Sequence, residues 1–328
     1  MKTGKLTENV WKRSVRNQIK TKRDEVLAGA GIGENCAVFS CEQDSLLSVS
    51  VQPVIWSGAY AAKYAVYGAV NAIAASGAEP AAIIFSMLLP ENTEEGQIKE
   101  WTAQTEAACA GLGIQAAGDG IRVTEAVNHP VFTVSGIGKS AGKGFFSVKE
   151  VKPGQDIVMS KWAGLEGTAV LAREKEKELL TKYPFRFIEE AKEFDRFLSI
   201  VPEAATAVKS GVCAMHAVSE GGIFGALWEM AEGAGVGLEI DWKRILVKQE
   251  TVEICEFFGL NPYLLMAGGC LLMAADNGHG LVRALEEASV PAAVIGKTTD
   301  GNDRIVINGE ERRFLELPKP DELYKIIR

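Results

Sequence analysis

Two glycine-rich turns mark places where this chain could bind an anion. Gly164 and Gly167 follow an apolar run and Lys161, and Gly221-Gly222 opens a later helical segment shortly after His216. The first N–H groups of a helix have no partner within the helix, so such starts attract anions. Lys161 and His216 are candidate phosphate contacts. The same glycines would also suit plain strand-to-helix turns, so both interpretations stay open.

Two carboxylates, Glu166 and Glu220, stand beside these turns. Each could contact a ligand, and each could equally stabilise the positive end of a helix dipole. The cysteines and histidines indicate no further chemistry. None of the six cysteines forms a Cys-x-x-Cys pair, and the three histidines are scattered, so neither a zinc site nor a disulfide framework is predicted. Most cysteines have apolar neighbours and suit a core in a reducing cytoplasm.

Strands alternate with helices in both halves, which predicts two sheets, each covered by helices. Gly77 suits the position after a helix end, and Thr93 suits an N-cap. A Gly/Ser/Lys-rich linker at Gly138–Gly144 places the domain boundary near residue 145, giving domains 1–145 and 146–328. The predicted strands are Cys36–Ser40, Leu46–Val51, Ala82–Leu88, Val131–Gly138, Ile157–Ser160, Ala214–Val218, Leu271–Ala274 and Ala292–Ile295, and the helices Tyr60–Ser76, Thr93–Gly111, Gly167–Glu178, Phe187–Leu198 and Ile223–Gly233.

Composition is that of a globular protein long enough for two domains. Of 328 residues, 47% are hydrophobic and 24% charged, and no apolar run reaches the ~18 residues of a membrane span. The net charge of −8 argues against nucleic acid as the main partner. Residues 1–23 are the basic exception. They could form a phosphate- or RNA-binding arm, or an amphipathic helix with Val10, Trp11, Val15 and Ile19 on its apolar face.

Five separated segments carry a family resemblance that spans most of the chain. They are Gly29–Val38, Val70–Pro80, Lys161–Ala169, Met215–Gly222 and, more weakly, Asn261-Pro262. Together they resemble the aminoimidazole-ribonucleotide-synthase (PurM-like) superfamily, and within it the HypE-like hydrogenase-maturation proteins. The resemblance implies a two-domain α+β fold with a C-terminal α/β layer domain. It also implies a homodimer in which the N-terminal sheets close a barrel, with ATP and Mg²⁺ bound along the interface.

Most acidic positions of the family motifs are replaced here. Carboxylates usually hold the Mg²⁺ of an ATP site, but the corresponding positions carry Asn35, Gln52, Ala72 and Ala217. The Gly118-Asp119-Gly120 segment, which resembles a family loop, keeps its acid. The resemblance leaves no catalytic residue and no metal ligand assigned. It implies candidate ligand contacts from Glu34, Asn35, Gln52, Asn71, Asp119, Lys161, Gly164, Glu166, Gly167, His216 and Glu220.

Three hypotheses follow for the function. The first is a catalytically degenerate HypE-like protein that acts as a binding or partner subunit, beside an active paralogue or a maturation partner. The second is an active ATP-dependent enzyme with a rearranged site. The third is a binder of another anionic metabolite. HypE proteins end in a reactive cysteine, whereas this sequence ends Lys325-Ile326-Ile327-Arg328 and has its last cysteine at Cys270, so we do not expect that thiol chemistry.

Overall fold

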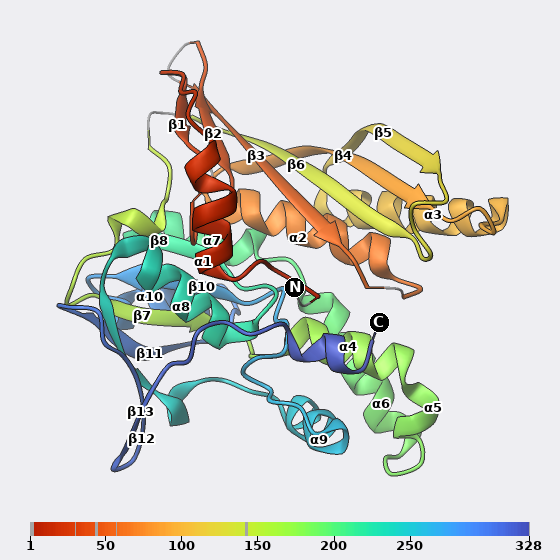
Figure 1. Cartoon of the computed structure of the whole chain (residues 1–328). Coiled ribbons are helices and arrows are strands. Elements are labelled where there is room, and N and C mark those ends of the chain that lie inside the picture. Colours follow the sequence, from red (N-terminus) through yellow and green to blue (C-terminus); the bar gives the residue numbers. More distant parts are fainter. Residues whose placement is uncertain (1–2, 30, 43–44, 57, 142–143, 328) are drawn as a thin grey trace.

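The N-terminal half forms a six-stranded sheet with helices on one face. The computed structural model describes residues 3–327 apart from 30, 43–44, 57 and 142–143 (Figure 1). The strand order is β1-β2-β3-β6-β4-β5, with only β4 and β5 parallel among the described pairs. The strands are β1 (Val26–Ala28), β2 (Ala37–Ser40), β3 (Ser45–Val54), β4 (Glu79–Leu89), β5 (Gln115–Val123) and β6 (Val131–Ala141), and the helices α1 (Glu8–Ser14), α2 (Ala61–Ala75) and α3 (Glu95–Leu112).

The C-terminal half forms a seven-stranded sheet of order β13-β12-β9-β11-β7-β10-β8. Helix α8 packs on one face of this sheet, and α7 and α10 pack on the other. The strands are β7 (Asp156–Ser160), β8 (Val212–Ala217), β9 (Gly237–Asp241), β10 (Leu271–Ala275), β11 (Ala292–Thr299), β12 (Arg304–Asn308) and β13 (Glu311–Phe314). The helices are α4 (Leu165–Glu174), α5 (Glu176–Leu179), α6 (Phe185–Lys192), α7 (Val201–Lys209), α8 (Gly222–Ala234), α9 (Gln249–Phe258) and α10 (Gly278–Glu287).

Helix α2 lies between the two halves, packed under the first sheet and against α7 and β8 of the second (Figure 1). Its sequence explains this position, because it carries one charged residue, Lys63, and is apolar on nearly all sides. Gly77 follows the C-cap of the helix with φ +82°, the position after a helix end that the sequence predicted for it. The α+β class with two sheets is confirmed. Among the described residues, no helix is both long and apolar enough to cross a membrane.

Several local predictions were wrong, for local reasons. Glu94, not Thr93, caps α3, because Glu94 and Gln97 exchange hydrogen bonds in a capping box. The segment around Asp119 is part of the edge strand β5 rather than a loop. The predicted helix 167–178 starts two residues earlier and is divided into α4 and α5, and residues 193–197 form a 3₁₀ turn after α6. Of the predicted linker, 138–141 belong to β6, while 142–143 lie outside the described residues.

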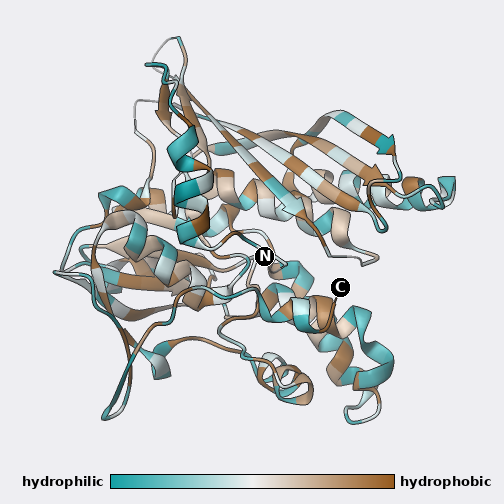
Figure 2. Cartoon of the chain, viewed as in Figure 1, coloured by the Kyte–Doolittle hydropathy of each residue, from teal (hydrophilic) through white to brown (hydrophobic). Residues whose placement is uncertain are grey.

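The predicted amphipathic helix of the N-terminal basic segment is shorter than expected, and its apolar face is only partly packed, with Val10, Trp11 and Val15 half-buried. Helix α1 has only seven residues, and none of them is buried. Ile19, expected on the apolar face, lies beyond the helix and is 56% exposed. Figure 2 accordingly shows α1 as mostly hydrophilic. Polar contacts to α8 also hold this segment in place, and they lead into the candidate site.

Candidate functional site

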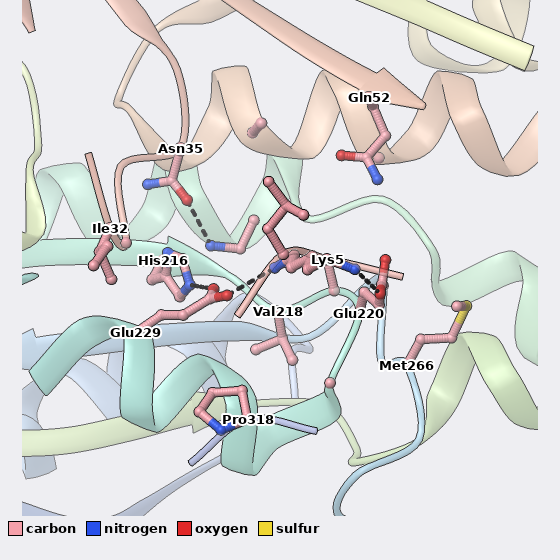
Figure 3. A pocket seen from close by; sticks show the side chains of 18 of the residues that line it. Lys5, Ile32, Asn35, Gln52, His216, Val218, Glu220, Glu229, Met266 and Pro318 are labelled. Carbon is pink, nitrogen blue, oxygen red and sulfur yellow. Dashed lines mark hydrogen bonds and ion pairs between the residues drawn. The ribbon is translucent and has the colours of Figure 1, made fainter. Parts of the chain in front are cut away.

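A cavity of about 740 Å³ lies between the two halves of the molecule (Figure 3). The N-terminal half contributes the glycine-rich turn at 31–35, the end of β3 and one side of α2. The C-terminal half contributes the loop after β8 and the first turn of α4. Residues 5–9 and the segment 317–319 complete the wall. Segments far apart in the sequence thus meet at one hollow, which is the arrangement expected of a ligand site.

Seven of the eleven candidate residues line this cavity, namely Glu34, Asn35, Gln52, Asn71, Glu166, His216 and Glu220. Ala72 and Ala217, which stand at two of the replaced acidic positions, also line it. The other four candidates, Asp119, Lys161, Gly164 and Gly167, are not among the lining residues, although Gly164 and Gly167 flank Glu166, which is. Asp119 is exposed on β5 at the sheet edge. Whether any of these residues binds a ligand stays a prediction.

Asn35 uses both ends of its amide to join the two halves of the molecule. Its Nδ2 donates to the Met215 carbonyl at 2.9 Å, and its Oδ1 accepts from the Ala217 N–H at 3.0 Å. An aspartate could accept the second bond but could not donate the first. The side chain therefore has a structural partner at each polar atom, and its oxygen is already engaged.

Asn71, on the buried side of α2, likewise forms hydrogen bonds to two backbone groups through the two ends of its amide. Its Nδ2 donates to the Leu198 carbonyl at 2.7 Å, and its Oδ1 accepts from the Ile200 N–H at 3.0 Å. The residue is 3% exposed. The amide thus satisfies two backbone groups that would otherwise be buried without partners.

Glu34 and Gln52 are also engaged by neighbouring groups. The Glu34 carboxylate lies 2.8 Å from Lys149 Nζ and accepts from Ser147 Oγ at 2.9 Å. The side chain of Gln52 lies against Gly68 of α2, where a Cβ would approach Gln52 Cγ to 2.8 Å. Among the described residues, no three His, Cys, Asp or Glu side chains are grouped so that they could hold a metal ion.

The predicted phosphate contact Lys161 is a buried structural ion instead. Its Nζ lies 2.7 Å from Glu203 Oε1 and donates to the carbonyls of Phe197 and Ser199 at 2.7 and 2.5 Å. The two charged side chains are 7% and 1% exposed. Burial raises the pKa of Glu203, although Lys161 opposes the shift. All contacts that the structure gives this ammonium group are internal.

The glycines at both predicted anion-binding turns have close neighbours. A Cβ on Gly164 would approach Thr251 Cγ2 to 2.7 Å, and one on Gly167 would approach Leu265 Cγ to 2.4 Å. At the start of α8, the Gly221 N–H donates to Asp321 Oδ2 at 2.6 Å. The chain's own carboxylate therefore occupies the place where an anion was expected. The tight-turn interpretation explains these glycines without a ligand.

Glu166 is the cavity carboxylate with the fewest partners. It accepts one hydrogen bond, from the Gly268 N–H at 3.0 Å, and forms no ion pair with any other residue that the structure describes. Burial raises the pKa of Glu166 to about 8, and the nearby charges of Asp321 and Asp195 act in the same direction. Asp321 itself has a pKa raised by burial to about 7. Asp195 is itself paired with Lys63 and Arg173, so Glu166 is the carboxyl of this group that lines the cavity and has no ion pair to a described residue.

The sequence did not predict two charged residues at the opposite end of the cavity. Glu229 contacts His216, and Lys5 contacts Glu229. His216 Nε2 lies 3.0 Å from Glu229 Oε2, and Lys5 Nζ lies 2.9 Å from Glu229 Oε1 (Figure 3). Although burial opposes the shift, Lys5 and His216 lower the pKa of Glu229 to about 2. Since the carboxylate accepts from Nε2, Nδ1 is the other polar atom of His216, and it is buried without a hydrogen-bond partner among the described residues.

Comparisons with known proteins give the family. The chain is 29% identical over 278 residues to carbamoyl dehydratase HypE of Rhodobacter capsulatus, covering 83% of this chain and 78% of the relative. It is 26% identical over 308 residues to a putative hydrogenase expression/formation protein of Methanocaldococcus jannaschii, covering 90% and 86%.

Solved structures show the same fold. A HypE–HypF complex gives a TM-score of 0.75 at 18% identity, covering 94% of this chain and 99% of that one. A HypE solved with ATP gives 0.70 at 16%, covering 97% and 94%. The family descriptions "AIR synthase related protein, N-terminal domain" and "C-terminal domain" match residues 33–140 and 152–308. The chain therefore belongs to the AIR synthase related protein family, and it contains both domains of that family.

Proposed function

We propose that this protein is a HypE-like binding subunit in hydrogenase maturation that does not carry out Mg-ATP chemistry by the family's route. The relatives named above as HypE and hydrogenase formation proteins support the pathway. One observation supports the absence of Mg-ATP chemistry. The four replaced acidic positions all line the same cavity. One holds Asn35, whose two polar atoms are hydrogen-bonded to backbone groups, and the others hold Gln52, Ala72 and Ala217.

The donor set does not fit the metal of Mg-ATP. Mg²⁺ prefers carboxylate and phosphate oxygens in a near-octahedral arrangement. Here Asn35 has both polar atoms engaged, and the side chains of Ala72 and Ala217 offer no oxygen. The lining of the cavity contains five glutamates and two lysines, so its carboxylates are only partly balanced by cations. An acidic, metal-poor cavity of this kind weakens triphosphate binding.

Calorimetry with ATP tests this proposal directly. We expect no Mg²⁺-dependent binding of ATP to the wild-type chain. The variant Q52D/A72D/A217D restores three acids and keeps both hydrogen bonds of Asn35. We expect this variant to bind ATP at least about tenfold more tightly with Mg²⁺ than without, a difference of roughly 1.4 kcal/mol. The matched control A103D/A107D/A110D adds the same charge on exposed positions of α3 and should not bind.

The opposite result would favour the second hypothesis. Tight, Mg²⁺-dependent binding to the wild-type chain, followed by ADP release, would identify an active enzyme with a rearranged site. Binding to the α3 control would show that added charge alone is responsible, and it would remove the argument from these three positions.

We also propose that the chain forms a homodimer through the open face of its first sheet. Helices α2 and α3 cover only one face, and among the described elements none covers the other (Figure 1). Exposed apolar side chains lie on it, with Val51 64% exposed, Ile84 46% and Leu88 39%. Exposed apolar side chains gathered on an uncovered sheet face mark an interaction site, here with polar residues such as Ser135 between them. A second copy offers the same chemistry, and burial of both faces would stabilise the pair.

Light scattering coupled to size-exclusion chromatography checks the dimer. We expect the wild-type chain to elute at twice the chain mass and Ile84→Lys to elute as a monomer, because the substitution places a charge in the apolar interface. Leu180→Lys, at a residue 44% exposed on a different surface, is the control and should remain dimeric. A monomeric wild-type chain would contradict the proposal. The partner in maturation would be a second protein, as in the solved HypE–HypF complex.

A further inference from the structure

The N-terminal segment, residues 4–12, crosses the wall of the cavity and touches its charged residues. The Lys5 N–H donates to Glu220 Oε1 at 2.7 Å, and the Lys5 ammonium contacts Glu229 (Figure 3). Gly4 lies so close to Glu220 that a Cβ on it would be 2.3 Å from Glu220 Oε1. The segment therefore covers two of the carboxylates that any ligand entering from this side would meet.

A second group of contacts fixes the far end of the same segment to α8. Lys12 Nζ lies 2.7 Å from Glu232 Oε1, and the Trp228 indole donates to Glu8 Oε2 at 3.3 Å. Arg304 holds Glu232 from the other side at 2.6 Å. Helix α8 thus presents a row of polar side chains, Trp228, Glu229 and Glu232, that matches the polar side chains of the segment.

These contacts are of a kind that opens readily. None of the α1 residues is fully buried, and Val10 and Trp11 are only half-buried, so apolar burial contributes less to docking than in a core helix. The Lys5 and Lys12 side chains remain 47% and 35% exposed, so water reaches the cation of each ion pair and added salt screens it. Residues 16–27 after the helix are all exposed, so the chain there can move without breaking a core.

We propose that residues 4–12 form an autoinhibitory strap, which in the closed state closes the side of the cavity next to Glu220 and Glu229 and must leave before a ligand can enter from that side. The positive charge of the strap matches the acidic wall beneath it. Release would uncover that wall, and salt would favour release because it screens exposed ion pairs. This proposal does not depend on whether the ligand is a nucleotide.

Carboxyl labelling of the full-length chain tests the strap. A water-soluble carbodiimide with glycinamide modifies accessible carboxyls, and mass spectrometry gives the rate at Glu220. Glu310, which is exposed in the β12–β13 hairpin, serves as the reference within the same chain. In Lys12→Ala, which is altered far from Glu220 along the segment, we expect Glu220 to react about two- to fivefold faster relative to Glu310. Raising the salt concentration should accelerate the wild-type chain towards the same rate.

Two further variants make the outcome decisive. Gly4→Ala should also speed the reaction, because Gly4 has φ +103° and a Cβ there meets the Glu220 carboxylate. Lys99→Ala is the matched control, since Lys99 forms the same i,i+4 pair with a glutamate on exposed α3 and should leave the Glu220 rate unchanged. Equal Glu220 rates in the wild-type chain, Lys12→Ala and Gly4→Ala would overturn the strap. Mg-ATP binding by the wild-type chain would overturn only the proposed function.

Discussion

Replacing Lys161 by methionine is expected to lower the free energy of unfolding by about 3–5 kcal/mol, among the largest effects of any single substitution in this chain. The methionine fills much of the volume but leaves the Glu203 carboxylate without its cation, at a residue only 1% exposed. The carbonyls of Phe197 and Ser199 lose their donor as well. Urea denaturation followed by circular dichroism measures the change as a lower midpoint.

A double variant separates the loss of the ion pair from a general packing defect. In Lys161→Met/Glu203→Gln no buried charge remains, so we expect recovery of much of the lost stability. Lys99→Met removes an exposed lysine and should change stability by less than about 0.5 kcal/mol. If Lys161→Met proved as stable as the wild-type chain, the ion pair with Glu203 would not be needed for stability. The prediction that Lys161 contacts a phosphate would then regain support.

The sequence predicted the elements that have strong local signals. Helix α2 is continuous and apolar, and Gly77 marks its end, so its predicted bounds differ from the observed ones by one residue at each end. The edge strand β5 escaped prediction because its residues Gly118, Asp119 and Gly120 are typical of a loop. Pairing with β4, a non-local interaction, decides its conformation.

The candidate site was predicted in position more than in chemistry. Residue types near glycine-rich turns located most of the cavity wall. They could not reveal that Asn35 and Asn71 bond to backbone groups more than a hundred residues away, since such partners depend on the tertiary fold. Nor could they show that Asp321, near the C-terminus, caps the start of α8. The sequence indicates Lys5 only as part of a basic segment, because its partner Glu229 is more than two hundred residues away in the chain.

Glu166→Gln should stabilise the protein at pH 8 by about 2–4 kcal/mol and have little effect at pH 5. The folded-state pKa of Glu166 is raised by burial to about 8, above the ordinary value of 4.5. A group with a raised pKa contributes its stability fully below the unfolded pKa, and that contribution is lost as pH rises towards the folded pKa. The wild-type chain therefore loses stability between about pH 5 and pH 8, and glutamine, which does not ionise, avoids the loss.

Differential scanning calorimetry at pH 5 and pH 8 measures this effect as a difference in Tm between variant and wild type. Asp321, whose pKa is also raised, remains in both proteins, so its own titration largely cancels in the difference. Glu106→Gln, at an exposed position on α3, is the control and should show no such difference at either pH. A Tm difference for Glu166→Gln that does not grow with pH would mean that the carboxylate is ionised at little cost.

A cation that enters the cavity would lower the pKa of Glu166 and reduce the advantage of the variant. The same measurement repeated with MgCl₂ therefore reports on metal entry without any assay of activity.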